Sequence, residues 1–469
     1  MSNDLKFYIN GEWVQSDSNE LIDVINPANE EVIGQVTAGT KKDINDAVTA
    51  ASEAFISFSK STQEERIELL KKIIQEYENR YKDFVEVITK EMGAPTWLSE
   101  RAQANTGLIN FKETLEALEE YEFEKQEGAY TLRREPIGVI GMITPWNWPM
   151  NQITTKVSAA IATGCTMVLK PSEISPYCSM LLAEVMHTAG VPKGVFNLVN
   201  GYGPIVGAAL SEHEKVDMMS FTGSTRAGIA VAQASALTVK RVQQELGGKS
   251  ANIILDDVAD LEKSVKGGAG HCFLNSGQSC NAPTRMLVSA ENYDKAVEIA
   301  IATADSTTIG DPSGEFRLGP ISNKTQYEKI IKLIEIGIEE GARLVAGGVE
   351  RIILTMKEQN IISEIEQSRV SVLYVNDEMQ KKYSYKVRID AGMGNRFAFV
   401  FQLSSNPNNV HLEIFEAGES VYYKSDFYTI EEALLDEEFV KMYPSLSTQQ
   451  IEQAALSAGA LPEIFKALS

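Results

Sequence analysis

Cysteine is scarce in this chain of 469 residues, and no two cysteines form a closely spaced pair. The four present are Cys165, Cys178, Cys272 and Cys280. Disulfide frameworks and zinc sites need more cysteines or CxxC spacing, so neither is expected here. We therefore predict reduced thiols and no metal site. Cys165 and Cys272 lie among apolar neighbours and are expected to pack inside the protein.

Basic residues are fewer than acidic ones, which argues against nucleic acid and anionic membranes as partners. The sequence has 43 Lys and Arg against 65 Asp and Glu, a formal net charge of −22. Nucleic acid and anionic membranes bind basic surfaces, so neither is an expected partner. The chain lacks an apolar run of membrane-spanning length, and its start, MSNDLKFYINGEWV, lacks the pattern of a secretory signal. A cytoplasmic enzyme or binding protein is the expectation.

At 469 residues the chain is longer than one hydrophobic core usually supports, so two or three domains are expected. The order of apolar and polar residues predicts an α/β protein. The N-terminus predicts a hairpin around Asn10-Gly11, followed by helices near 41–60, 62–92 and 97–120. From about residue 137, short apolar strands alternate with helices, as in a Rossmann-like doubly wound parallel sheet. The strands are IGVIGMITP, TMVLKPS, VFNLV, VDMMSFTG and VQQELG. Ligands of such sheets bind beyond the carboxyl ends of the strands.

One thiol lies in a polar loop of a kind that suits a nucleophile. Cys280 is part of Asn275-Ser-Gly-Gln-Ser-Cys-Asn, and Glu245 upstream begins Glu-Leu-Gly-Gly-Lys. Cysteine reacts as the thiolate, in polar, partly open surroundings with a base nearby. Glu245 beside two glycines suits a general base that must admit water. The alternatives are an unreactive thiol and a solvated glutamate.

Three further motifs follow predicted strands. Thr144-Pro-Trp-Asn-Trp-Pro149 is a rigid loop that would aim the Asn147 amide in one direction, as an oxyanion hole requires, or it is only a structural corner. Gly223-Ser-Thr-Arg-Ala-Gly228 opens a helix and would hold a phosphate, or it is only a turn. Lys170 and Glu173 in LKPSE would reach ribose hydroxyls, or they form an exposed ion pair.

Together, TPWNWP, LKPSE, FTGSTRAG, QELGGKS and NSGQSCNAPTR make residues from about 7 to 350 resemble the NAD(P)-dependent aldehyde dehydrogenases. The resemblance implies that Cys280 attacks an aldehyde and that Asn147 and the Cys280 backbone N–H hold the resulting oxyanion. Hydride then passes to the nicotinamide. Water activated by Glu245 hydrolyses the thioester and releases a carboxylic acid.

The same resemblance implies a set of cofactor-binding residues. It assigns Lys170 and Glu173 to the adenosine ribose, and Gly223, Ser224 and Gly228 to the pyrophosphate and its turn. It adds Thr144, Pro145, Trp146, Gly203 and Leu246 to the cofactor site, and Lys156 to the catalytic site, although a lysine on a helix face is commonly only solvated. Glu173 favours NAD, because its charge would repel the extra phosphate of NADP, which stays the alternative.

The resemblance ends near residue 350. The family continues with an EEIFGP-like segment, a later glycine-rich loop and a C-terminal pairing strand, and none of these is found; Glu413-Ile-Phe415 is read as chance within a strand. We expect an NAD-binding domain at 1–247, an incomplete catalytic domain at 248–350 and an unassigned α+β module at 351–469. That module is predicted to hold a helix near 355–368, the strands SVLYV, YSYKVRI, RFAFVFQL, HLEIFEA and VYYKSDFY, and acidic helices from Thr429 onward.

Two alternatives to a working aldehyde dehydrogenase stay open. One is a chimeric protein that binds nucleotide or a protein partner without turnover, because half of the catalytic domain is replaced. The other is a CoA-acylating enzyme of the same fold, which Glu245 disfavours because a general base suits hydrolysis. A homo-oligomer is typical of the family, but the missing pairing strand puts it in doubt here.

Overall fold

The computed structural model describes residues 3–347 and five strands between residues 369 and 427. These strands occupy residues 369–373, 383–390, 397–403, 410–415 and 423–427. The chain divides into two units, Met1–Leu333 and Ile334–Ser469. The first contains a seven-stranded sheet and the second a five-stranded sheet.

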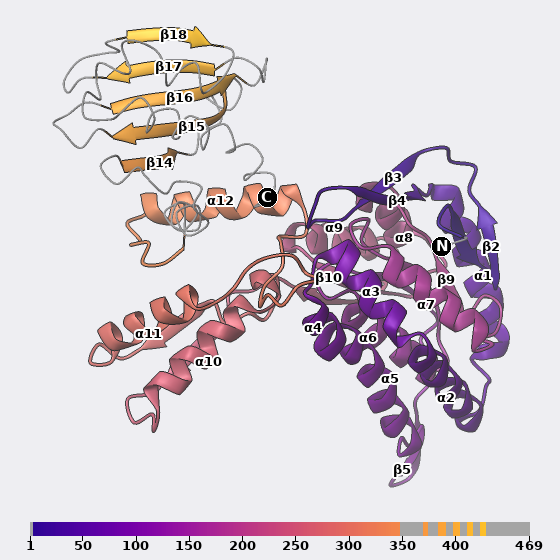
Figure 1. Cartoon of the computed structure of the whole chain (residues 1–469). Coiled ribbons are helices and arrows are strands. Elements are labelled where there is room, and N and C mark those ends of the chain that lie inside the picture. Colours follow the sequence, from indigo (N-terminus) through magenta and orange to yellow (C-terminus); the bar gives the residue numbers. More distant parts are fainter. Residues whose placement is uncertain are drawn as a thin grey trace. The chain divides into compact units, whose positions relative to one another are not determined.

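The seven-stranded sheet has a parallel centre and an antiparallel edge. In spatial order its strands are β11 (Arg241–Leu246), β10 (Met218–Gly223), β7 (Val139–Ile143), β8 (Thr166–Lys170), β9 (Phe196–Leu198), β1 (Lys6–Ile9) and β2 (Glu12–Gln15). Figure 1 labels its strands β2, β9 and β10. Strands β7 to β11 pair in parallel. The chain proceeds from β7 toward β9, then returns to the other side of β7 with β10, which creates a switch point of the kind where ligands bind. The expected doubly wound parallel sheet is confirmed.

The predicted N-terminal hairpin is confirmed as β1 and β2. Phe7 pairs with Val14 and Ile9 with Glu12. Between the strands, Asn10 has a φ of 53° and Gly11 a φ of 77°. Two successive positive φ values are typical of a type I′ turn, whose twist matches that of the flanking strands. Asn and Gly tolerate that backbone, so the local sequence alone selects the turn.

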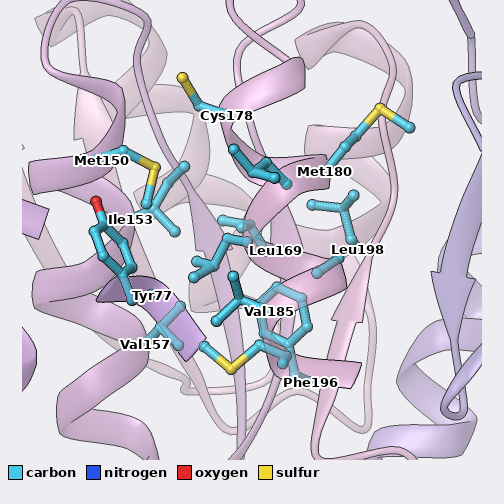
Figure 2. Packing of buried hydrophobic residues seen from close by; sticks show 14 of the residues in the cluster. Tyr77, Met150, Ile153, Val157, Leu169, Cys178, Met180, Val185, Phe196 and Leu198 are labelled. Carbon is cyan, nitrogen blue, oxygen red and sulfur yellow. The ribbon is translucent and has the colours of Figure 1, made fainter. Parts of the chain in front are cut away.

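Helices cover both faces of the sheet. One core cluster joins the sheet to α2 (Gln63–Asn79), α3 (Tyr81–Met92), α5 (Ala104–Glu119), α6 (Pro149–Ala162) and α7 (Tyr177–Thr188). A second cluster joins its other face to α1 (Lys41–Phe58), α8 (Ala208–Glu212) and α9 (Thr225–Ala236). Met167 and Leu169 of β8 belong to the first cluster and Val168 to the second, as the two-residue period of a strand requires. Figure 2 shows the first cluster, with Tyr77 and Phe196 among its aromatic members.

The prediction of one helix over residues 62–92 is wrong. The segment forms α2 and α3, which are interrupted at Arg80 with φ −102° and ψ 10°. Tyr77 and Phe84 are both buried and stack with ring centroids 4.2 Å apart. Their spacing of two helical turns keeps the apolar pattern in phase across the interruption, so periodicity alone cannot detect it.

Both α1 and α2 begin with capping boxes, at Thr40 with Asp43 and at Thr62 with Glu65.

Several short elements were not anticipated from the sequence. They are the hairpin strands β3 (Leu21–Ile25) and β4 (Val32–Thr37), the hairpin strands β5 (Glu124–Glu127) and β6 (Tyr130–Arg133), and the strand β12 (Ala251–Ile254). The helix predicted near 97–120 is confirmed as α4 (Thr96–Leu98), the π-helical η1 (Ser99–Gln103) and α5 in unbroken succession. Strand β12 pairs in parallel with β13 (Arg285–Val288). Ile254, Val265 and Ile299 pack this pair against α10 (Leu261–Phe273) and α11 (Tyr293–Asp305). Helix α12 (Lys324–Glu339) follows.

The five strands of the second unit form an antiparallel meander. They are β14 (Arg369–Leu373), β15 (Tyr383–Asp390), β16 (Phe397–Leu403), β17 (Val410–Phe415) and β18 (Tyr423–Phe427), hydrogen-bonded in chain order. Each overlaps a strand expected from the sequence. Glu413-Ile-Phe415 lies within β17, as expected for a chance match. The predicted helix near 355–368 and the acidic helices from Thr429 onward lie outside the described residues.

A buried carboxylate joins α3 to the helix that follows β8. Glu91 has no exposed surface, and its oxygens accept hydrogen bonds from the backbone N–H groups of Tyr177 (2.7 Å) and Cys178 (2.9 Å) at the start of α7. These N–H groups have no partners inside their own helix, so Glu91 caps α7 from outside. Burial raises the pKa of Glu91 to about 7, against the opposing effect of these hydrogen bonds.

We expect Glu91 to make the stability of the protein depend on pH. Between its ordinary pKa of 4.5 and the raised value of about 7, the folded protein keeps a proton that the unfolded chain has lost. Stability therefore falls as pH rises through this window, by up to roughly 3 kcal/mol. In Glu91→Gln this loss should be absent, as measured by denaturant unfolding from pH 4 to 8. Glu86→Gln, an exposed change on the same helix, should keep the wild-type slope; an unchanged slope in Glu91→Gln would contradict the assignment.

Candidate active site

The motifs predicted to carry chemistry gather at the carboxyl edge of the parallel strands. Thr144 follows β7, Lys170 ends β8, Gly223 ends β10 and Glu245 lies near the end of β11. The strands are parallel and adjacent, so their carboxyl ends lie along one edge. The expectation that these motifs share an edge is confirmed.

The loop that bears Cys280 begins with an unusual backbone. After α10 comes η3 (Leu274–Gly277), in which Asn275, Ser276 and Gly277 have φ values of 58°, 56° and 73°. Left-handed φ is unfavourable for residues with side chains and is often found at functional sites. Cys280 is exposed, whereas Cys165 is buried and Cys272 half-buried. The loop therefore presents one open thiol.

Two side chains of the Trp/Pro loop bond to the loop that bears Cys280. Asn147 donates from Nδ2 to the Gln278 carbonyl oxygen over 2.8 Å, and Trp148 donates from Nε1 to Ser279 Oγ over 2.8 Å. Both acceptors lie within two residues of Cys280. The Asn147 amide carries a second N–H beside the one used by Gln278. The Asn147 amide is therefore held beside the loop that bears Cys280.

Two residues of this region were missed by sequence reasoning. Gln103 and Asn275 are both fully buried and bond to each other and to the Asn147 carbonyl oxygen. Asn275 lies inside the motif NSGQSCN, so its proximity to the thiol was a usable signal. Gln103 lies in a segment of mixed polarity, E-R-A-Q-A-N, and no sequence pattern marks it. Only the packing of three distant segments reveals its position.

Glu245 and Lys156 are connected by a chain of hydrogen bonds. Lys156 donates from Nζ to Ser220 Oγ (3.1 Å), and Ser220 donates to Gln243 Oε1 (3.4 Å). Gln243 donates from Nε2 to Glu245 Oε1 (3.1 Å). Glu245 is exposed, and the loop that follows its strand reaches the thiol loop, since a Cβ built on Gly248 would lie 3.4 Å from the Cys280 carbonyl oxygen. The carboxylate thus lies on a strand that leads directly to the thiol.

Lys156 is not the solvated lysine that its helix position made the ordinary expectation. Its side chain is 9% exposed, on α6. Burial lowers the pKa of Lys156 to about 8, and the charge of Glu245 acts in the opposite direction. A buried amine whose pKa lies near neutral is suited to proton transfer.

Lys170 and Glu173 form an ion pair at the end of β8. Lys170 Nζ lies 2.9 Å from Glu173 Oε2, and the Lys170 side chain is 4% exposed while that of Glu173 is 34% exposed. The alternative of a solvated pair is therefore wrong for Lys170. Burial fixes the lysine and leaves the carboxylate partly open, so Glu173 is accessible to a ligand.

The turn after β10 leads into α9. Ser224 is the N-cap and accepts from the Ala227 backbone N–H over 3.3 Å. Gly228 is buried against β11, where an added Cβ would lie 2.8 Å from Leu246 Cδ2. A side chain at Gly228 would push α9 away from the strand. The start of this helix, at the sheet edge, is a geometry that binds phosphate.

The remaining predicted cofactor residues lie in the same neighbourhood. Pro145 and Trp146 are half-buried, and Trp146 packs against the first core cluster. Thr144 is buried, and its Oγ1 has no hydrogen-bond partner within the part of the chain that the structure describes. Gly203 begins the π-helical turn η2 (Gly203–Gly207), and a Cβ there would meet open space. An unpaired hydroxyl, an accessible carboxylate and a helix start fit a dinucleotide.

Two negative findings hold for the described residues. No group of three or more His, Cys, Asp and Glu side chains there is arranged to hold a metal ion. Among the helices of the same residues, none combines the length and apolar character needed to cross a membrane.

A family model described as "Aldehyde dehydrogenase family" matches residues 13–363. The chain belongs to the aldehyde dehydrogenase family. The family assignment and the fold class expected from the sequence are confirmed, and the match extends to residue 363, past the boundary near 350 at which the resemblance was expected to end. Residues 364–469 lie outside the family match.

Named relatives agree with this assignment. A 3-succinoylsemialdehyde-pyridine dehydrogenase of a Pseudomonas species is 49% identical over 348 residues, which cover 74% of this chain and 73% of the relative. The crystal structure of a cysteine-to-alanine mutant of aldehyde dehydrogenase C from Pseudomonas syringae, complexed with NAD+ and octanal, matches with a TM-score of 0.73 and 46% identity. This match covers 74% of the present chain and 72% of the P. syringae chain. An aldehyde dehydrogenase from Bacillus cereus in complex with NAD+ matches with a TM-score of 0.71 and 34% identity, covering 74% and 72%.

We expect Lys156 to make the stability of the protein depend on pH in the alkaline range. Between a pKa of about 8 in the folded protein and the ordinary value of 10.5, the unfolded chain binds a proton that the folded protein lacks. Stability should therefore rise with pH across this window, by up to roughly 3 kcal/mol. Lys156→Met should abolish that rise in denaturant unfolding measured from pH 7.5 to 10.5. Lys112→Met, at a half-exposed lysine of α5, should retain it. Equal slopes in wild type and Lys156→Met would show a normally solvated amine.

Proposed function

We propose that this chain is an NAD-dependent aldehyde dehydrogenase that oxidises aldehydes to carboxylic acids, with Cys280 as nucleophile. Membership of the family supplies the reaction class. The observation that carries the residue assignment is the pair of hydrogen bonds from Asn147 and Trp148 to the loop of Cys280. These bonds hold an amide donor beside an exposed thiol, which is what acyl chemistry at sulfur requires.

The first step is attack of the Cys280 thiolate on the aldehyde carbon. A carbon–sulfur bond forms, and the carbonyl oxygen becomes the oxyanion of a thiohemiacetal. The second N–H of Asn147 Nδ2 and the Cys280 backbone N–H would hold that oxyanion, and the bond from Asn147 to the loop of Cys280 supports this assignment. When bound, NAD supplies the hydride acceptor, and the loss of hydride converts the thiohemiacetal to a thioester.

The second step is hydrolysis of the thioester. Glu245 takes a proton from water, whose oxygen attacks the acyl carbon, and the thiolate leaves. Glu245 is exposed and lies near the end of β11, before two glycines, so water reaches it directly and solvent can take its proton after hydrolysis. The hydrogen bonds from Lys156 through Ser220 and Gln243 all donate toward Glu245, so they orient its carboxylate. Hydrolysis by Glu245 is also the reason to prefer this reaction over acyl transfer to CoA.

The cofactor site is assigned to the edge of the sheet described above. Lys170 and Glu173 would hold the adenosine ribose, and Gly223, Ser224 and the start of α9 the pyrophosphate, with Gly228 and Leu246 packing beneath. Thr144, Pro145, Trp146 and Gly203 would line the same site. The solved relatives from P. syringae and B. cereus bind NAD+, and the partly open carboxylate of Glu173 disfavours the extra phosphate of NADP. Octanal in the P. syringae structure supports a small or medium aldehyde as substrate.

The domain division proposed from the sequence accompanies this function. The cofactor site belongs to residues 1–247 and the thiol to residues 248–350, while residues 351–469 form a module without an assigned role. A cytoplasmic location and a homo-oligomer are part of the same proposal, the second resting on family analogy alone.

A second candidate is a protein that binds nucleotide or a partner without turnover. The observation in its favour is that residues 364–469 lie outside the family match. Calorimetry with NAD, together with an assay for NADH, separates the two candidates. Heat of binding without NADH from any aldehyde would support the second.

Cys280→Ala should reduce aldehyde-dependent NADH formation by at least about 10³-fold, because the other three thiols are buried or half-buried. The measurement is NADH absorbance with NAD and a panel of aldehydes of increasing chain length. Cys272→Ala, which changes a half-buried thiol of α10, should keep wild-type turnover. Turnover retained in Cys280→Ala would refute the assignment.

Glu245→Gln should separate the two steps. The first NADH per site should form at close to the wild-type rate, whereas steady-state turnover should fall about 100-fold, since only hydrolysis needs the base. Rapid mixing would show a burst of one NADH per subunit followed by a slow phase. Glu262→Gln, in the first turn of α10, is the matched control and should show no burst. A slowed first turnover in Glu245→Gln would place the carboxylate in the first step instead.

A further inference from the structure

Gln103 lies at the point where three segments distant in sequence meet. It is fully buried and ends the π-helical turn η1 (Ser99–Gln103), directly before α5. Its Nε2 donates to the Asn147 carbonyl oxygen and to Asn275 Oδ1, each over 3.1 Å. Asn275 Nδ2 in turn donates to the same Asn147 oxygen over 2.9 Å. The three residues thus form a closed triangle of hydrogen bonds.

This triangle continues into the turn that precedes Cys280. The Asn275 carbonyl oxygen accepts from the Gln278 backbone N–H over 3.1 Å and from Gln278 Nε2 over 3.0 Å. The Gln278 carbonyl oxygen accepts from Asn147 Nδ2. A displacement of Gln103 would therefore move the Asn147 backbone and the turn before Cys280 relative to each other.

The hydrogen bonds of Gln103 indicate that the residue positions its neighbours. Its Oε1 is buried and has no hydrogen-bond partner among residues 3–347. An unsatisfied buried polar atom costs stability, so Gln103 makes its bonds to Asn147 and Asn275 while leaving its own Oε1 unsatisfied. The site also contains left-handed Asn275 and Ser276, which need support from neighbours to persist. An inserted π-turn is a recurrent feature of functional sites, and here it brings the amide of Gln103 inward.

We propose that Gln103 is a positioning residue for the oxyanion site, setting the Asn147 amide against the backbone N–H of Cys280. It touches neither substrate nor cofactor, and it acts through Asn147 and Asn275. The inference rests on the proposed function for the identity of the nucleophile. It goes beyond that function by naming the group that aligns the two oxyanion donors.

The test compares two reactions of Cys280 that differ in their need for an oxyanion site. Acylation by p-nitrophenyl acetate forms a carbon–sulfur bond through a tetrahedral oxyanion and expels p-nitrophenolate. Alkylation by iodoacetamide forms a carbon–sulfur bond at a CH₂ group and expels iodide, without an oxyanion. Neither reaction uses NAD. In Gln103→Met, which keeps length but removes the donor, acylation should slow about 10- to 100-fold while alkylation stays within about twofold of wild type.

Two further variants make the result decisive. Asn275→Gly removes the partner amide at a position where φ is 58°, which glycine adopts without strain, so it should fold and show the same selective loss. Thr114→Val removes a hydrogen bond between α5 and Ser158 of α6 that does not reach the thiol loop, and both of its rates should match wild type.

Other results of these measurements would overturn or support the positioning role of Gln103. Equal losses of acylation and alkylation, or no loss in Gln103→Met and Asn275→Gly, would overturn the positioning role. Wild-type protein that is alkylated but shows no p-nitrophenolate burst would overturn it too, because no oxyanion site would then exist to be aligned. A normal burst with no NADH from any aldehyde would reject the dehydrogenase function while leaving the role of Gln103 supported.

Discussion

The site depends on the hydrogen bonds that join two irregular loops, one after β7 and the other before Cys280. No strand ladder or helix fixes either loop, so side-chain bonds from Asn147, Trp148 and Gln103 decide how they meet. A nucleophile and its oxyanion donors must be aligned to within a fraction of an ångström for acyl chemistry. The parallel sheet supports this contact, because it brings the loop after β7 to the sheet edge, where the loop before Cys280 reaches it.

Burial shifts the pKa values of two ionisable groups in the same unit, Lys156 and Glu91. Lys156 is buried beneath the sheet edge and linked through Ser220 and Gln243 to Glu245, which is open to solvent. The two ends of this chain of hydrogen bonds therefore differ in exposure, with a buried amine at one end and a solvent-exposed carboxylate at the other. Glu91 is buried for another reason, because its carboxylate caps the helix that follows the Lys170 loop. Glu91 thus holds helix backbone in place, whereas Lys156 is connected by hydrogen bonds to Glu245.

Much of the first unit could be predicted from the sequence, and the failures have physical causes. Asn10-Gly11 fixed a turn, and alternating apolar strands identified the doubly wound sheet. The break at Arg80 was invisible because Tyr77 and Phe84 keep the apolar period across it. The hairpin of β5 and β6 was missed because its side chains are all exposed and β5, EKQE, has no apolar residue. Gln103 was missed because a polar residue between helices carries no pattern of its own.

The sequence by itself determined the family, the order of the strands along the chain and the residue types available for chemistry, because motifs such as NSGQSC and TPWNWP are local. It also showed that the family resemblance ends within the chain. Only the tertiary structure decided that Lys156 is buried, that Lys170 is held by Glu173, and that Gln103 and Asn275 tie Asn147 to the thiol loop. Those facts depend on contacts between segments more than 40 residues apart in most cases, and local patterns carry no information about such contacts.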